Sequence, residues 1–156
     1  MQRVISQIRS LDDKIISFIE VNGITLLRIT IGLIYVLFGF LKFLPNYSPA
    51  EALAGETIEL ITFGVFSGKV ALFSLAIIEC LIGLGLMLQI QTKWVVRIAL
   101  WHMLCTFIPM ILLPNASFTQ NPYSLSLVGQ YILKNLIIVS ALLLIYTNEK
   151  KRTTSF

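Results

Sequence analysis

The sequence has little charge. Only 13% of its 156 residues are Asp, Glu, Lys or Arg, whereas 56% are hydrophobic, and the mean hydropathy is +0.85. A soluble domain of this length needs far more charge to cover its surface. The composition therefore excludes an ordinary soluble domain and predicts one compact integral membrane protein.

Cysteine and histidine are also scarce. The chain has two cysteines, Cys80 and Cys105, and one histidine, His102. The spacing excludes a thioredoxin-like CxxC motif, and the number excludes a disulfide scaffold. His102 and Cys105 are three residues apart, but a closed metal site needs about four ligands. We therefore expect no metal here, and a hydrogen-bonded core histidine beside a packing cysteine. Cys80 and Cys105 stay candidates for a redox pair.

What is present is long apolar runs. Each has about 20 residues, which as a helix matches a hydrocarbon core of about 30 Å. Because lipid offers the backbone no hydrogen-bond partners, these runs must be helical. We predict an all-α, polytopic membrane protein, an up-down bundle of four transmembrane helices. The predicted spans cover residues 24–44, 70–90, 94–114 and 127–146.

Shorter helices are expected outside the spans. Apolar residues in 4–19 follow helical spacing, with charged residues on the other side. This predicts an N-terminal amphipathic helix within 1–22, which either lies in the cytoplasmic interface or packs on the base of the bundle. The loop after the first span predicts a short outer helix interrupted at Gly55. We thus divide the chain into the amphipathic helix, a transmembrane domain (23–147) and a basic cytoplasmic tail (148–156).

The basic residues gather at three places next to the spans. They precede the first span, lie between the second and third, and follow the fourth: Arg3, Arg9 and Lys14; Lys93 and Arg97; Lys150, Lys151 and Arg152. The positive-inside rule then places both termini in the cytoplasm, and we expect a bacterial inner (plasma) membrane. The net charge of +4 is distributed for contact with a lipid bilayer, so we expect no nucleic-acid partner.

The first span carries a polar stripe. Arg28, Gly32, Tyr35, Gly39 and Lys42 follow at spacings of four, three, four and three, which places all five on one helix face. Such a stripe should face protein, and its glycines allow a neighbouring helix to come close. Alternatively, Arg28 and Lys42 extend to opposite membrane interfaces and the stripe serves packing alone.

Three more ionisable residues lie inside the other spans: Glu79, His102 and Lys134. A lone carboxylate at this depth must be protonated or paired. Glu79 and Lys134 reach similar depths by helical rise, so we predict an ion pair between them. Gln130 shares the face of Lys134, and Asn135 lies beside it.

The interior then carries more positive than negative charge. Arg28, Lys42 and Lys134 are cations in or at the edges of spans, whereas Glu79 is the one anion among the spans. A positive interior would attract an anion or a polar carbonyl such as a quinone head group. The alternative is a structural salt bridge that fixes helix register and has no chemistry.

Several segments, in this order, resemble the DoxX-like family of small four-helix membrane proteins. They are RITIGLIYVLFGFLKFLP, LPNYSPAEALAGETIELITFG, IIECLIGLGLML and GQYILKN, within about residues 27–144. The resemblance implies a membrane subunit linked to quinone-dependent sulfur oxidation, redox complexes or oxidative stress. It points to a functional set of Arg28, Lys42, Glu79, Gln130, Lys134 and Asn135.

Three functions remain open. The first is a redox or oxidative-stress subunit whose polar residues inside the spans bind a quinone-like or anionic small molecule. These residues are Arg28, Tyr35, Lys42, Glu79, His102, Gln130, Lys134 and Asn135. Without any flavin, iron–sulfur or nucleotide motif, its chemistry would need a bound quinone or a membrane or cytoplasmic redox partner. A homo-oligomer is a separate candidate assembly. The second is a proton-coupled transporter using Glu79, His102 and Lys134. The third is a structural anchor or assembly factor.

Overall fold

The computed structural model describes residues 2–44, 51–119 and 124–154, and for 2–6 and 152–154 the backbone alone. In these residues the protein is all-α, apart from one isolated β-bridge between Phe118 and Leu125. Four helical stretches are long and apolar enough to cross a membrane: Gln7–Leu41, Gly68–Met87, Thr92–Leu112 and Leu127–Lys151. The side chains of Arg3 and Arg152, expected at membrane edges, lie outside the described residues.

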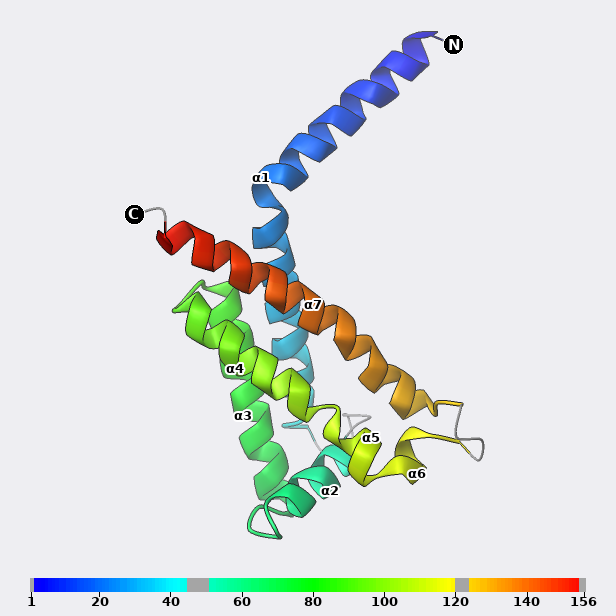
Figure 1. Cartoon of the computed structure of the whole chain (residues 1–156), viewed down its shortest axis with the longest axis vertical. Helices are drawn as coiled ribbons and strands as arrows, with labels where there is room; N and C mark the ends of the chain where they lie inside the picture. The colour runs from blue at the N-terminus through cyan, green and yellow to red at the C-terminus, as the bar shows by residue number, and fades with distance from the viewer. Residues whose placement is uncertain (1, 45–50, 120–123, 155–156) are drawn as a thin grey trace.

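The first long helix is longer than predicted. α1 runs from Gln2 to Leu41 as one helix of 40 residues, which at 1.5 Å per residue is about 60 Å. The amphipathic helix and the first span are therefore continuous. Figure 1 shows α1 changing direction part-way, with its N-terminal portion projecting from the other helices. Every side chain from Gln7 to Val21 is exposed, because no other element packs on this portion.

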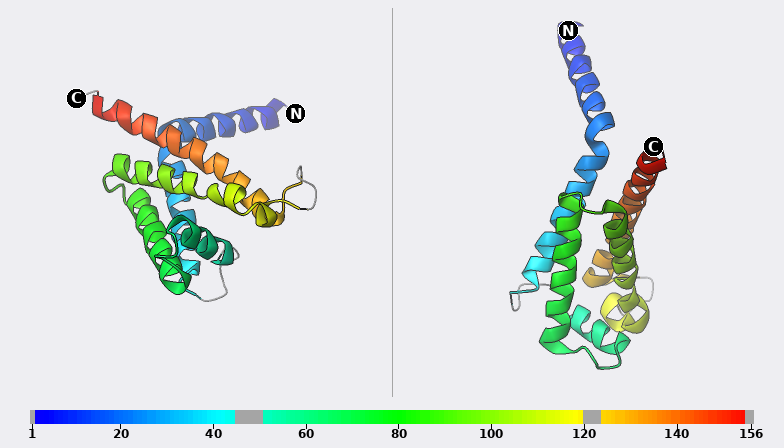
Figure 2. Two further views of the ribbon diagram at one scale, coloured as in Figure 1. Left: turned by 60° about the horizontal axis from the view of Figure 1, so that its bottom comes forward. Right: turned by 90° about the vertical axis from the view of Figure 1, so that its left-hand side faces the viewer.

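The remaining helices alternate in direction (Figures 1 and 2). α2 (Glu51–Ile61) lies beside the start of α3 (Gly68–Met87), and α4 (Thr92–Cys105) returns from a tight turn. The short α5 (Ile108–Leu112) and α6 (Pro114–Ser117) follow, and α7 (Leu127–Thr154) runs back beside α4. Both termini lie at the same end.

Proline and glycine act differently in two of these helices. Pro109 lacks an N–H for the helix, and α4 ends at Cys105 before α5 begins at Ile108. The helix is thus interrupted just before this proline. The predicted break at Gly55 is wrong, because α2 continues through it. A glycine costs a helix only about 1 kcal/mol, too little to stop one that packs on a neighbour.

The core is built from two close helix pairs, α1 with α3 and α4 with α7. The pairs meet through buried apolar side chains from all four helices, including Ile31, Leu86, Val96 and Leu142. Around this narrow core most large apolar side chains of the long helices stay exposed. Such an apolar exterior is typical of a bundle whose solvent is lipid rather than water.

Candidate functional site

The close contact of α1 with α3 determines the geometry of the site. A Cβ built on Gly83 would lie 2.5 Å from the carbonyl oxygen of Gly32, and one built on Gly32 would lie 2.7 Å from that of Gly83. Two turns further along α1, a Cβ on Gly39 would meet the backbone nitrogen of Cys80 at 3.0 Å. The polar stripe of the first span therefore faces protein, as predicted, because only glycine permits this approach.

At the end of α1, Lys42 turns its side chain back toward α3. Its ammonium lies 2.6 Å from Oε2 of Glu79, and the two side chains are only 7% and 9% exposed. The same ammonium donates a weaker hydrogen bond to the carbonyl oxygen of Phe38, at 3.4 Å. A flexible lysine stem allows this return, since it reaches one turn along its own helix. Glu79 is thus paired at short distance inside the bundle.

The predicted ion pair between Glu79 and Lys134 is wrong. Lys134 is exposed on α7, and its ammonium lies 4.9 Å from the ring centroid of Tyr131. A similar depth in the membrane does not predict an ion pair, because the two side chains must also lie on helices that contact each other. The glycines at 32, 39 and 83 mark α1 and α3 as the closest neighbours, and this signal in the sequence favours Lys42 as the partner of Glu79.

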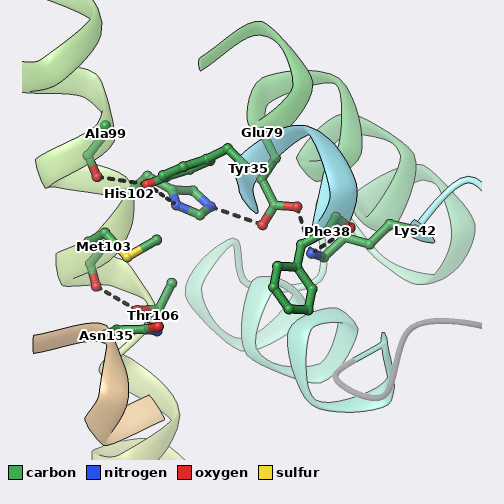
Figure 3. A network of polar contacts seen from close by, with 9 residues as sticks. All are labelled: Tyr35, Phe38, Lys42, Glu79, Ala99, His102, Met103, Thr106 and Asn135. Atoms are coloured by element: carbon green, nitrogen blue, oxygen red, sulfur yellow. Dashed lines mark hydrogen bonds and ion pairs between the residues drawn. The ribbon is translucent and has the colours of Figure 1, made fainter. Parts of the chain in front are cut away.

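His102 on α4 joins the cluster from the other side. Its Nε2 lies 3.4 Å from Oε1 of Glu79, and its Nδ1 lies 3.3 Å from the hydroxyl oxygen of Tyr35. The Tyr35 hydroxyl also donates to the carbonyl oxygen of Ala99 at 3.1 Å. Figure 3 shows the resulting series from Tyr35 through His102 and Glu79 to Lys42. We call these four residues the polar cluster.

Asn135 approaches the cluster without joining it. Its side-chain amide donates to Oγ1 of Thr106 at 2.9 Å, and this hydroxyl donates to the carbonyl oxygen of Met103 at 2.6 Å. The contact ties α7 to α4 one turn beyond His102 (Figure 3). Thr106 is the partner that sequence reasoning did not identify for Asn135, although its spacing of four from His102 places it on the same face.

Arg28 and Gln130 lie elsewhere. Arg28 is buried, and its guanidinium donates to the carbonyl oxygen of Leu86 and, at 3.3 Å, to Oε1 of Gln89. Oxygen atoms of α3 and of the turn that follows it therefore accept hydrogen bonds from the Arg28 guanidinium. Gln130 is exposed and donates locally to the carbonyl oxygen of Leu125 at 3.5 Å. Neither residue contacts the polar cluster.

The cysteines are free thiols. Cys80 faces α1, with its sulfur 3.9 Å from the carbonyl oxygen of Val36, whereas Cys105 ends α4. That they form a redox pair stays a prediction. In the described part of the chain, no three His, Cys, Asp or Glu side chains are grouped closely enough to hold a metal ion.

One hydrogen-bond donor of the polar cluster has no acceptor among the described residues. The Lys42 ammonium has three N–H groups, and among the described residues only Glu79 and Phe38 accept from it. The Glu79 carboxylate, 2.6 Å away, balances the charge of this ammonium. Such a site suits a neutral acceptor, such as a carbonyl oxygen, better than an anion.

Comparisons with protein-family models, with curated proteins and with solved structures find no match to this chain. The family to which the chain belongs is therefore not assigned. Its function must be argued from the polar cluster and from the four long apolar helices.

Proposed function

We propose that this chain is a small integral membrane subunit of a redox or stress-response system, and that its polar cluster binds the carbonyl head group of a quinone-like molecule. The observation that carries the proposal is the third N–H of the buried Lys42 ammonium, for which no described residue supplies an acceptor. A quinone carbonyl is a neutral acceptor, and its isoprenoid tail dissolves in the bilayer around the helices.

The surroundings support a membrane ligand. The cluster lies among four helices with an apolar exterior, so a ligand that reaches it arrives from lipid more easily than from water. The DoxX-like resemblance supports a quinone-linked system in the same way. The proposed setting is a bacterial inner membrane with both termini in the cytoplasm. Electrons would come from a redox protein partner, because this chain has no motif for a redox cofactor.

The test is the quinone content of protein purified in a mild detergent, measured by solvent extraction and mass spectrometry. Lys42→Met should lower the bound quinone at least about tenfold, which corresponds to losing one charge-assisted hydrogen bond. Lys134→Met is the matched control, because it removes an exposed lysine outside the cluster, and it should keep the wild-type quinone content.

A second variant separates binding from folding. Lys42→Met alone leaves Glu79 buried without its partner, which itself destabilises the bundle. The charge-free pair Lys42→Met with Glu79→Gln avoids this cost. We expect the double variant to fold and to carry no quinone. A folded double variant with full quinone content would show that the cluster has a structural role only.

The linear arrangement of the cluster favours one other function, proton transfer. His102 contacts Tyr35 with one ring nitrogen and Glu79 with the other, and an imidazole can accept a proton at one nitrogen and release it at the second. This reading predicts proton flux in liposomes containing the protein, and a loss of that flux in Glu79→Gln. A proton flux that is unchanged in Glu79→Gln would contradict this proton-transfer function.

A further inference from the structure

A second polar site lies at the other end of α4, where this helix begins beside the last turns of α7. The guanidinium carbon of Arg97 lies 4.7 Å from the ring centroid of Trp94 and 5.5 Å from that of Tyr146. Nη2 of Arg97 donates to the hydroxyl oxygen of Tyr146 at 3.0 Å, and Nε does so at 3.4 Å. Side chains from two antiparallel helices thus form one unit.

This unit keeps hydrogen-bond donors available. A guanidinium has five N–H groups, and two of them are directed at Tyr146. The Tyr146 oxygen accepts these bonds, so its own O–H is left to donate. No described residue accepts from the phenol or from the remaining N–H groups of Arg97. These donors are therefore available to an acceptor outside the described residues.

The surrounding charge is mostly positive. Lys93 and Lys150 are close enough to Tyr146 to act on it electrostatically, and Lys151 follows on α7. Glu149 is the one acidic residue in the same stretch of sequence. An acceptor that meets both Arg97 and Tyr146 is therefore favoured if it is an anion.

The site also lies at the depth of lipid head groups. Trp94 and Tyr146 are near the ends of two candidate spans, and such aromatic residues typically lie at the membrane–water interface. The Trp94 side chain is largely exposed, at 62%, so its apolar surface is available to acyl chains. A free phosphate ion would make no use of this apolar surface, but a phospholipid would.

We propose that Arg97 and Tyr146, with Lys93 and Lys150 around them, bind the phosphate of an anionic phospholipid. The planar guanidinium can hold two phosphate oxygens at once, and the phenol donates a further hydrogen bond. Trp94 packs beside the glycerol and the first carbons of the acyl chains. The site would anchor the α4–α7 pair to one leaflet, apart from the polar cluster and independently of the proposed quinone.

The experiment uses Trp94 as the reporter. The chain has two tryptophans, so Trp101→Phe leaves Trp94 alone. The full-length protein is placed in phosphatidylcholine vesicles with increasing fractions of nitroxide-labelled phosphatidylglycerol or nitroxide-labelled phosphatidylcholine, the label being close to the head group. We expect the labelled phosphatidylglycerol to quench Trp94 at a fraction at least about fivefold lower, since one basic residue at the surface contributes about that factor.

Three variants in this background locate the site. Arg97→Gln should lower the preference for phosphatidylglycerol about fivefold. Tyr146→Phe should lower it while preserving the ring that Arg97 contacts. Lys150→Gln removes the charge of an exposed side chain, so it tests the site even if Arg97→Gln does not fold. Lys69→Gln is the matched control, at the start of α3 and the opposite end of the bundle, and should have no effect.

Equal quenching by the two labelled lipids in the starting protein would overturn the proposal. So would an equal loss of preference in Arg97→Gln and Lys69→Gln, which would indicate attraction by net charge alone. Arg97→Lys makes the same distinction, because it keeps the charge but loses the planar fork. A preference unchanged in Arg97→Lys would contradict a built phosphate site.

Discussion

At the scale of single residues, the pairing of Lys42 with Glu79 is the most demanding feature of the molecule. Moving two charges from water into a bundle costs several kcal/mol per ion, and their attraction repays this only with good geometry. The 2.6 Å contact and the second contact from His102 supply that geometry. The fold is therefore more stable with the ion pair than with either charge alone. It need not be more stable than with two apolar side chains at the same positions.

This argument predicts opposite results for single and double variants. Glu79→Gln should lower the free energy of unfolding by about 3–5 kcal/mol, because it leaves the Lys42 ammonium buried without an anion. Adding Lys42→Met should recover most of that loss. Reversible unfolding in mixed detergent micelles measures both. A double variant as unstable as Glu79→Gln would contradict direct pairing of the two side chains.

The control for this measurement is Lys134→Met. Sequence reasoning had paired Lys134 with Glu79, whereas the structure places it on the exposed face of α7 over the ring of Tyr131. Its replacement should change the free energy of unfolding by less than about 1 kcal/mol, as expected for an exposed contact. A loss as large as that of Glu79→Gln would restore the earlier pairing.

At the scale of elements, the α1–α3 contact depends on small residues. Gly32 and Gly83 oppose each other so closely that a methyl group on either meets the carbonyl oxygen of the other within 2.7 Å. Backbone carbonyls cannot move aside as a flexible side chain would. The close approach is also what brings Lys42 within reach of Glu79, so helix packing and the polar cluster are coupled through these glycines.

Substituting alanine for glycine should therefore act in opposite directions at two sites. Gly83→Ala should destabilise the protein by about 1–3 kcal/mol through overpacking. Gly55→Ala in α2 should stabilise it by about 0.5–1 kcal/mol, because alanine favours a helix, and its Cβ would meet nothing closer than 4.0 Å. Thermal unfolding of the two variants tests both predictions. A harmless Gly83→Ala would mean that α1 and α3 are further apart.

At the scale of elements, α1 is also longer than a helix needs to be to cross a membrane. About 30 Å of helix, or about 20 residues, suffices to cross a bilayer, and α1 with its 40 residues is about twice that long. Its N-terminal turns carry Arg9, Asp12, Asp13, Lys14 and Glu20 on a helix with exposed apolar residues between them. This composition suits a helix that leaves the bundle and follows the interface.

At the scale of the whole molecule, the sequence predicted what depends on local rules. The four long helices follow from apolar runs of sufficient length, and the facing of the Arg28–Lys42 stripe follows from helical spacing. The partner of Glu79 was not predictable from depth, because pairing depends on which helices approach closely. The continuity of α1 was also missed, since the charged residues that suggested a boundary do not interrupt a helical backbone.

Orientation in the membrane is the last property that the whole chain determines. The contact of Arg97 with Tyr146 joins the start of α4 to the end of α7, and both chain termini lie at this end (Figure 1). The basic residues at the start of α4 and at the end of α7 therefore lie on one side, and the positive-inside rule predicts that this side faces the cytoplasm. A green fluorescent protein fused at the C-terminus should fluoresce in cells.

A second fusion tests the side of the membrane opposite the C-terminus. Alkaline phosphatase, which is active only where its disulfides form, should be active when inserted at Gly64, in the exposed turn between α2 and α3. Gly64 has a positive φ of 81° and no atom within 4 Å of its ideal Cβ position, so an insertion there disturbs little packing. An inactive phosphatase together with a dark C-terminal fusion would reverse the orientation, and with it the leaflet in which Arg97 meets its lipid.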